Sequence, residues 1–171
     1  MTDGLKTVRE LITATADWFG RHDVESPRLN AERLLGDVLK GTVPVLVAYG
    51  LGLSATAAAL VGFCAFLGHL FPVFFQFRGG KGVATAFGLL FPLHWPSGLV
   101  AGAVWLVVFG ATRISSVASL LAFIAAPISL WFWLPTAFWP MAALTLIMVI
   151  RHRANLAKLL SGEELGFRGK R

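Results

Sequence analysis

The chain has 171 residues, of which 56% are hydrophobic and only 14% are charged, and its formal net charge is +6. Soluble domains carry about 25% charged residues, so this composition excludes an ordinary soluble domain and predicts an integral membrane protein. The single cysteine, Cys64, excludes a disulfide framework, and no cluster of cysteine and histidine indicates a metal site.

Residues 1–36 carry most of the acidic residues and differ from the apolar sequence that follows. Apolar residues recur there at helical spacing, which predicts a first short helix containing Leu5, Val8, Leu11, Ile12 and Ala16. Ser26 and Pro27 are typical of a helix start, with serine at the cap and proline at the first helical position. We therefore predict a short soluble helical hairpin over residues 1–36, followed by a membrane domain over residues 37–171.

Residues 42–150 form an apolar region that charges and turn residues divide into segments. The sequence predicts about six transmembrane helices, at about 40–53, 55–77, 83–96, 98–112, 117–133 and 136–150. Several are shorter than the roughly 20 residues of a straight span, so tilted or broken helices are expected. No Asp or Glu occurs between Val38 and Gly162, so the membrane region offers no carboxylate as a general base. The predicted fold class is an all-α polytopic membrane helix bundle.

Basic residues occur at alternate connections between these segments, namely Lys40, Arg78, Lys81, Arg113, Arg151, Arg153 and Lys158. The other connections, near residues 52–54, 92–98 and 134–140, contain no lysine, arginine or carboxylate. The positive-inside rule then places the basic connections and both termini in the cytoplasm. Three tryptophans fall at the opposite interface, where this residue is enriched: Trp95, Trp133 and Trp139.

A glycine-rich basic stretch, GHLFPVFFQFRGGKGVAT, occupies residues 68–85. Glycines allow successive backbone N–H groups to surround an anion, and neighbouring cations strengthen such a site. The sequence therefore predicts a phosphate site at the membrane edge, formed by Arg78, Gly79, Gly80, Lys81 and Gly82. The alternative is a positively charged membrane anchor with a flexible turn. A nucleotide-binding P-loop is excluded, because Gly82 stands where that motif has serine or threonine.

Four polar clusters fall on the predicted cytoplasmic side, at residues 37–40, 78–81, 112–119 and 151–164. Loops on one face of a helix bundle can converge on a single site. Four separate snorkelling anchors are the alternative, which accounts for the lysines and arginines. It accounts less well for the uncharged polar residues among them, Ser116, Ser119, His152 and Asn155.

Four segments resemble, in matching order and at similar spacing, the bacterial acyl-phosphate-dependent glycerol-3-phosphate acyltransferases: residues 37–41, 68–85, 112–119 and 152–164. The first matches the entry to the second helix of that family, and the second is similar to its central motif. The third is similar to the third motif of the family, with Ser116 and Ser119 at its serines, and the fourth resembles its C-terminal motif. Together the resemblance extends over residues 37–166.

This resemblance implies a seven-helix enzyme of the bacterial cytoplasmic (inner) membrane, whose active site faces the cytoplasm. It implies transfer of a fatty acyl group from acyl phosphate to the 1-hydroxyl of glycerol 3-phosphate, giving lysophosphatidic acid and phosphate. The expected partners are these two substrates and membrane lipid, and no cofactor, metal or nucleic acid is expected.

The resemblance also suggests a role for each polar residue. The residues expected to act in catalysis, by stabilising charge or orienting the hydroxyl nucleophile, are Lys81, His69, Ser116, His152 and Asn155. The residues expected to bind substrate are Arg78, Gly79, Gly80, Gly82, Arg113, Ser119, Arg153 and Glu164. For three of these a structural role is the alternative: packing for His69, the membrane interface for His152, and a hydrogen bond to its own helix for Ser119.

Two other acyl-transfer mechanisms are disfavoured. No histidine is followed at the fifth position by aspartate, as it is in the acyltransferases that use His-x-x-x-x-Asp. No G-x-S-x-G sequence supplies a serine nucleophile. A mechanism that relies on positioning and electrostatics, without an enzyme nucleophile, remains.

The first transmembrane helix of the family and its Ser/Gly/Asn-rich loop are missing from the sequence. Residues 1–36 instead resemble the N-terminal helical region of release-factor glutamine methyltransferases, especially at residues 25–35. The catalytic Asn-Pro-Pro-Tyr of those enzymes is absent, so no methyltransferase activity is expected. The junction at residues 35–37 fits a natural fusion, a truncated copy or a mis-assigned start. The alternative function is therefore a catalytically impaired or non-catalytic membrane protein of the same fold, which binds lipid phosphate and docks through the hairpin.

Overall fold

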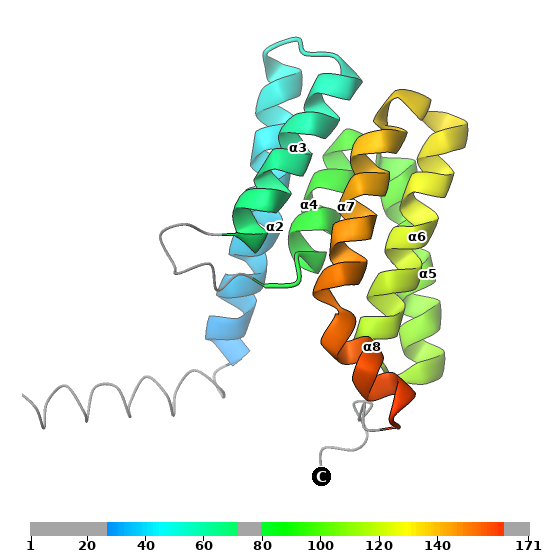
Figure 1. The fold of residues 1–171 in the computed structure, drawn as a ribbon. Coiled ribbons are helices and arrows are strands. Elements are labelled where there is room, and N and C mark those ends of the chain that lie inside the picture. The colour runs from blue at the N-terminus through cyan, green and yellow to red at the C-terminus, as the bar shows by residue number, and fades with distance from the viewer. Residues whose placement is uncertain (1–26, 72–79, 163–171) are drawn as a thin grey trace, which may run out of the picture. The chain divides into compact units, whose positions relative to one another are not determined.

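A computed structural model of the chain describes residues 27–71 and 80–162, while residues 1–26, 72–79 and 163–171 lie outside that description (Figure 1). The described part contains seven α-helices, one short 3-10 helix and no strand, so the predicted all-α class is confirmed. In chain order the elements are α2 (Pro27–Gly50), α3 (Ala55–Leu70), α4 (Val83–Leu93), α5 (Trp95–Thr112), α6 (Ser115–Trp133), η2 (Pro135–Ala137), α7 (Phe138–Arg151) and α8 (Arg153–Leu160).

The predicted apolar segments correspond to helices α2 to α7, but α2 begins well before the first segment and several other boundaries differ by a few residues. α3 begins at the predicted residue, because the hydroxyl of Ser54 accepts the backbone N–H of Ala57 and caps the helix. The predicted boundary between the third and fourth segments is wrong by a few residues. α5 begins earlier, at Trp95, because Nδ1 of His94 accepts the N–H of Ser97 at 3.3 Å and acts as the cap.

Only the second helix of the predicted N-terminal hairpin lies within the described residues. A helix does begin at Pro27, but α2 continues without a break through Gly36 and Asp37 to Gly50. The second helix of the predicted hairpin and the first predicted membrane segment are therefore one helix of 24 residues. The first predicted helix of the hairpin lies outside the described residues. Contacts divide the chain into two units after Gly36, and the bundle described below is the unit that begins at Asp37.

The exposed surface of the bundle is strongly apolar. By length and composition, α5 and α6 could each cross a membrane, and α3, α4 and the segment Pro135–Arg151 are apolar but shorter. α6 packs against both α5 and α7 and is more than half buried, whereas α5 is largely exposed. Large apolar side chains lie exposed on the helices, among them Leu106, Val107, Phe132 and Trp139. Such a surface is costly in water and suits a hydrocarbon environment.

α2 and α4 approach each other closely through two glycines. A side chain at Gly41 would overlap the backbone of Thr85, and one at Gly88 would overlap the backbone of α2. The hydroxyl of Thr42 donates to the Gly88 carbonyl oxygen at 2.8 Å and joins the two helices at the same level. Small residues allow this kind of close helix packing in membranes. The contact fixes the position of Asp37, one helical turn before Gly41, relative to α4.

Candidate active site

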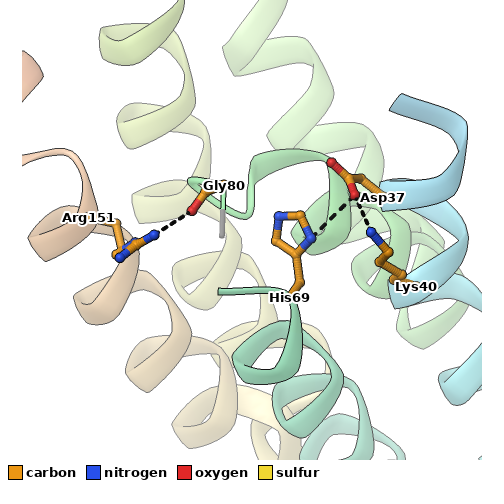
Figure 2. A network of polar contacts seen from close by, with 5 residues as sticks. All are labelled: Asp37, Lys40, His69, Gly80 and Arg151. Carbon is orange, nitrogen blue, oxygen red and sulfur yellow. Dashed lines mark hydrogen bonds and ion pairs between the residues drawn. The ribbon is translucent and has the colours of Figure 1, made fainter. Parts of the chain in front are cut away.

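Polar residues gather at one end of the bundle, the lower end in Figure 1. α3, α5 and α7 end there, and α4 and α6 begin there (Figure 1). As far as their residues are described, the four polar clusters predicted from the sequence therefore lie at the same end. Figure 2 shows the part of this end at which Asp37, Lys40, His69, Gly80 and Arg151 meet.

His69, on the last turn of α3, lies next to a carboxylate from α2. Its Nδ1 is 3.3 Å from Oδ1 of Asp37, and the same oxygen accepts a hydrogen bond from Nζ of Lys40 at 2.7 Å (Figure 2). The His69 side chain is only 9% exposed, and that of Asp37 is 31% exposed. A carboxylate at this distance can fix the orientation and the tautomer of an imidazole. His69 thus has a charged partner, which a residue that only packs would not need.

Asp37 was not predicted as a candidate site residue from the sequence. The His-x-x-x-x-Asp pattern concerns only the fifth position after a histidine, whereas Asp37 precedes His69 by most of two helices. Asp37 also lies one residue before the long segment without acidic residues. Its place at the start of one apolar segment, with His69 at the end of the next, is the signal that could have found it, because consecutive antiparallel helices bring such positions together.

Arg151, at the end of α7, holds the loop that leads into α4. Its Nη2 donates to the Gly80 carbonyl oxygen at 3.1 Å, and its guanidinium carbon lies 5.7 Å from the ring centre of Phe71. A side chain at Gly80 would come within 2.9 Å of Nε2 of His69. Gly80 therefore lies between side chains from two different helices (Figure 2). The sequence placed Arg151 among the basic connections and in one of the polar clusters, but it did not predict this contact.

The start of α4 has the geometry of an anion-binding helix end. Gly82 has a φ of +79°, and a side chain there would overlap Phe66 and Leu70, so both the backbone and the packing require glycine. Among the described residues, no side-chain hydrogen bond caps this first turn. Its backbone N–H groups and the helix dipole favour an anion. Lys81 is exposed directly before the turn, which agrees with the predicted phosphate site.

The third predicted cluster lies at the turn between α5 and α6. Arg113 is exposed and adopts a left-handed conformation (φ +59°) at the end of α5, and Ser116 lies largely buried in the first turn of α6. Ser119 is 2% exposed. Its hydroxyl accepts from Nε1 of Trp105 at 3.1 Å and donates to the Ser115 carbonyl oxygen at 2.8 Å. These bonds favour the structural alternative for Ser119, and a role in substrate binding stays a prediction.

His152 lies at the bend between α7 and α8 and is 1% exposed, which does not fit a residue at the membrane interface. Its Nδ1 is 2.8 Å from the carbonyl oxygen of Met148, so a neutral ring carries its proton on Nδ1 and has Nε2 as an acceptor. Arg153 is exposed and Asn155 is half-buried on α8. Three further predicted site residues, Arg78, Gly79 and Glu164, lie outside the described residues.

The polar end carries groups that recognise anions and hydroxyl groups. Residues 27–71 and 80–162 contain no group of three or more His, Cys, Asp or Glu side chains that could hold a metal. The end carries arginines, lysines, imidazoles and hydroxyls, together with backbone N–H groups at the start of α4. Such groups recognise phosphate oxygens and alcohols through charge-assisted hydrogen bonds.

The motifs at this end agree with a known family. The family model described as glycerol-3-phosphate acyltransferase matches residues 27–162. The chain belongs to this family. A glycerol-3-phosphate acyltransferase of Methylococcus capsulatus is 46% identical over 140 residues, which cover 81% of this chain and 71% of that protein. One of Pseudomonas fluorescens is 50% identical over 135 residues, which cover 78% of this chain and 71% of that protein.

The fold is also similar to that of a solved membrane enzyme. Crystal structures of PlsY, an integral membrane glycerol 3-phosphate acyltransferase, match with TM-scores of 0.77 for the glycerol 3-phosphate form and 0.76 for the lysophosphatidic acid form. The sequences are 34% identical, and the match covers 82% of this chain and 72% or 73% of PlsY. The chain is therefore a homologue of these enzymes and an integral membrane protein, as predicted.

The family match extends further toward the N-terminus than the predicted junction at residues 35–37. It begins at residue 27, which is also where α2 begins. Residues 27–36 thus align with the acyltransferase family and belong to the same helix as the residues that follow. The resemblance of residues 1–36 to glutamine methyltransferases is not shown.

Proposed function

We propose that this chain transfers a fatty acyl group from acyl phosphate to the 1-hydroxyl of glycerol 3-phosphate, giving lysophosphatidic acid and inorganic phosphate. Family membership and the likeness to PlsY in its glycerol 3-phosphate form support the acceptor substrate. The observation that carries the proposal is the arrangement of the glycine loop, residues 80–82. This loop is held by Arg151, lies beside His69 and leads into the start of α4.

The proposed reaction is balanced without a cofactor. The oxygen of the 1-hydroxyl attacks the acyl carbon, the bond from that carbon to the phosphate oxygen breaks, and phosphate leaves. The hydroxyl proton ends on the departing phosphate, and no covalent enzyme intermediate forms. Lys81 and the backbone N–H groups at the start of α4 stabilise the charge that develops on this phosphate.

The remaining predicted site residues bind and orient glycerol 3-phosphate in this proposal. Arg113 and Ser116, at the turn between α5 and α6, bind its phosphate or its hydroxyls. His152 and Asn155, at the bend after α7, orient the attacking hydroxyl, together with His69. Correct orientation of two bound reactants lowers the barrier without any enzyme nucleophile.

The site operates at the cytoplasmic edge of the bacterial inner membrane. The acyl chain of the donor belongs in lipid, whereas the phosphate groups of both substrates belong in water, so a polar bundle end suits the reaction. The lysines and arginines at this end support a cytoplasmic orientation by the positive-inside rule. With six spans, formed by α2 to α7, both termini lie on the same side.

The direct test is turnover by the purified chain in detergent. Given acyl phosphate and glycerol 3-phosphate, it should release inorganic phosphate and form lysophosphatidic acid. Lys81→Ala should lower kcat/KM roughly a hundredfold, because a charge-assisted bond to the leaving phosphate is lost. Lys158→Ala is the matched control: it removes an exposed lysine that lies on α8, outside the glycine loop, and it should retain wild-type activity. Turnover that is unaffected by Lys81→Ala would contradict the role of the loop, and ligand binding without turnover would favour the non-catalytic alternative.

A further inference from the structure

His69 bridges the carboxylate of Asp37 and the glycine loop. Its Nδ1 lies 3.3 Å from Oδ1 of Asp37, which comes from α2. Its Nε2, on the other edge of the ring, lies beside Gly80, where an added Cβ would be 2.9 Å away (Figure 2). Asp37 therefore contacts one ring nitrogen while the other faces the loop at which we place the substrate. The imidazole thus lies between Asp37 and the loop.

Burial favours a neutral His69 ring, and the carboxylate beside Nδ1 favours the tautomer that carries the proton there. Oδ1 of Asp37 already accepts a hydrogen bond from Lys40 at 2.7 Å, so its negative charge is shared. Burial disfavours the charged form of this imidazole, which is 9% exposed. The positive charges of Lys40 and Arg151 act in the same direction, and the carboxylate of Asp37 opposes them. A neutral ring can still donate Nδ1–H to Asp37, and Nε2 then carries a lone pair.

We propose that Asp37 is a positioning residue: it accepts the Nδ1–H of His69, so that Nε2 accepts a hydrogen bond from a hydroxyl of the glycerol substrate at the glycine loop. The inference rests on the function proposed above and assigns separate tasks within the site. A phosphate dianion presents only acceptor oxygens, which the lone pair of Nε2 repels, whereas a glycerol hydroxyl is a donor. The phosphate of the acyl donor therefore binds at Lys81 and the start of α4, and His69 recognises a hydroxyl of glycerol 3-phosphate.

The first test measures the tautomer and needs no turnover. In the full chain labelled with ¹⁵N-histidine and held in detergent micelles, the His69 signals should show a protonated Nδ1 and an unprotonated Nε2, assigned by their loss in His69→Gln. Glycerol 3-phosphate should shift the Nε2 signal, and inorganic phosphate alone should not. A proton on Nε2, or a doubly protonated ring, would overturn the proposal, because the ring would then donate to a phosphate oxygen.

The second test separates positioning from folding. Asp37→Asn should lower kcat/KM for glycerol 3-phosphate roughly tenfold, mainly through kcat, because one hydrogen bond to a charged group is lost. His69→Gln should lower it at least as much. In the double variant the two losses should not multiply, because Asp37 acts through His69, and losses that do multiply would contradict the proposal. Asp37→Glu, which keeps a carboxylate, should recover most of the activity lost in Asp37→Asn.

A matched control removes a different carboxylate from the same helix. Glu32→Gln changes an exposed residue of α2 and should retain wild-type activity and the wild-type His69 signals.

The two tests together distinguish a failure of the proposed acyl transfer from a failure of the role proposed for Asp37. A chain that shows the predicted tautomer and the shift with glycerol 3-phosphate, but no turnover, contradicts the proposed function alone. An active chain in which Asp37→Asn matches the wild type contradicts the role of Asp37 alone.

Discussion

His69 and His94 lie at helix boundaries at opposite ends of the bundle, and their surroundings differ. At the polar end, His69 lies 3.3 Å from the carboxylate of Asp37 and is part of a charged network. At the opposite end, Nδ1 of His94 caps α5 by accepting the N–H of Ser97 at 3.3 Å, and its ring lies 5.9 Å from that of Trp133. The connections at that end contain no lysine, arginine or carboxylate. Neighbouring charges, rather than the residue type, therefore distinguish His69 from His94.

The largest effect is expected from Gly82→Ala, at the polar end. The new side chain would overlap Phe66 and Leu70 and would adopt a left-handed conformation, so we expect a loss of stability on the order of 3 kcal/mol. Thermal unfolding in detergent measures it. Gly52→Ala is the matched control at the opposite end, because Gly52 also has a positive φ but no atom near its absent Cβ. If both variants lose equal stability, the packing of Gly82 contributes nothing.

Gly80→Ala should affect activity more than stability. The added Cβ would lie 2.9 Å from Nε2 of His69, so the imidazole or the glycine loop must shift. Gly80 itself is exposed, and the melting temperature should change little. We expect kcat/KM to fall roughly tenfold, the equivalent of one lost hydrogen bond. Full activity in this variant would show that the His69 edge facing the loop is unimportant for the reaction.

The smallest effect is expected from His94→Gln, which tests the uncharged end. Loss of the helix cap should lower stability by about 1 kcal/mol and leave kcat/KM unchanged. Burial lowers the pKa of His94 below its usual range, so the folded protein favours the neutral ring. The resulting stability is complete above a pH of about 6.5 and is lost as the pH falls through the lowered pKa. Melting temperatures of the variant, measured from neutral to acidic pH, should therefore fall less than those of the wild type.

Much of the fold was predictable from the sequence because its signals are local. Apolar runs, capping residues such as Ser54 and charged connections mark most of the helix boundaries. The continuity of α2 was missed because the composition changes sharply at Gly36 and Asp37, and composition does not report whether the backbone turns. The sequence placed His94 inside a segment, whereas its backbone N–H donates to Leu90 at the end of α4 and its side chain caps α5.

The candidate site was less predictable, because its contacts join residues that are distant in the sequence. The glycine loop and Lys81 stand out as a motif. The approach of Asp37 to His69 depends on how α2 lies against its neighbours, and the bond from Arg151 to Gly80 depends on where α7 ends. These distances follow from helix packing, which cannot be predicted from the spacing of residues along the sequence.

The backbone contact between α2 and α4 has a consequence for mutational scans of this protein. At Gly41 and Gly88 no side chain can rearrange to absorb a larger residue. A substitution there should push α2 and α4 apart and thereby move Asp37 relative to His69. These two glycines should therefore tolerate substitution poorly, although neither belongs to the proposed substrate site.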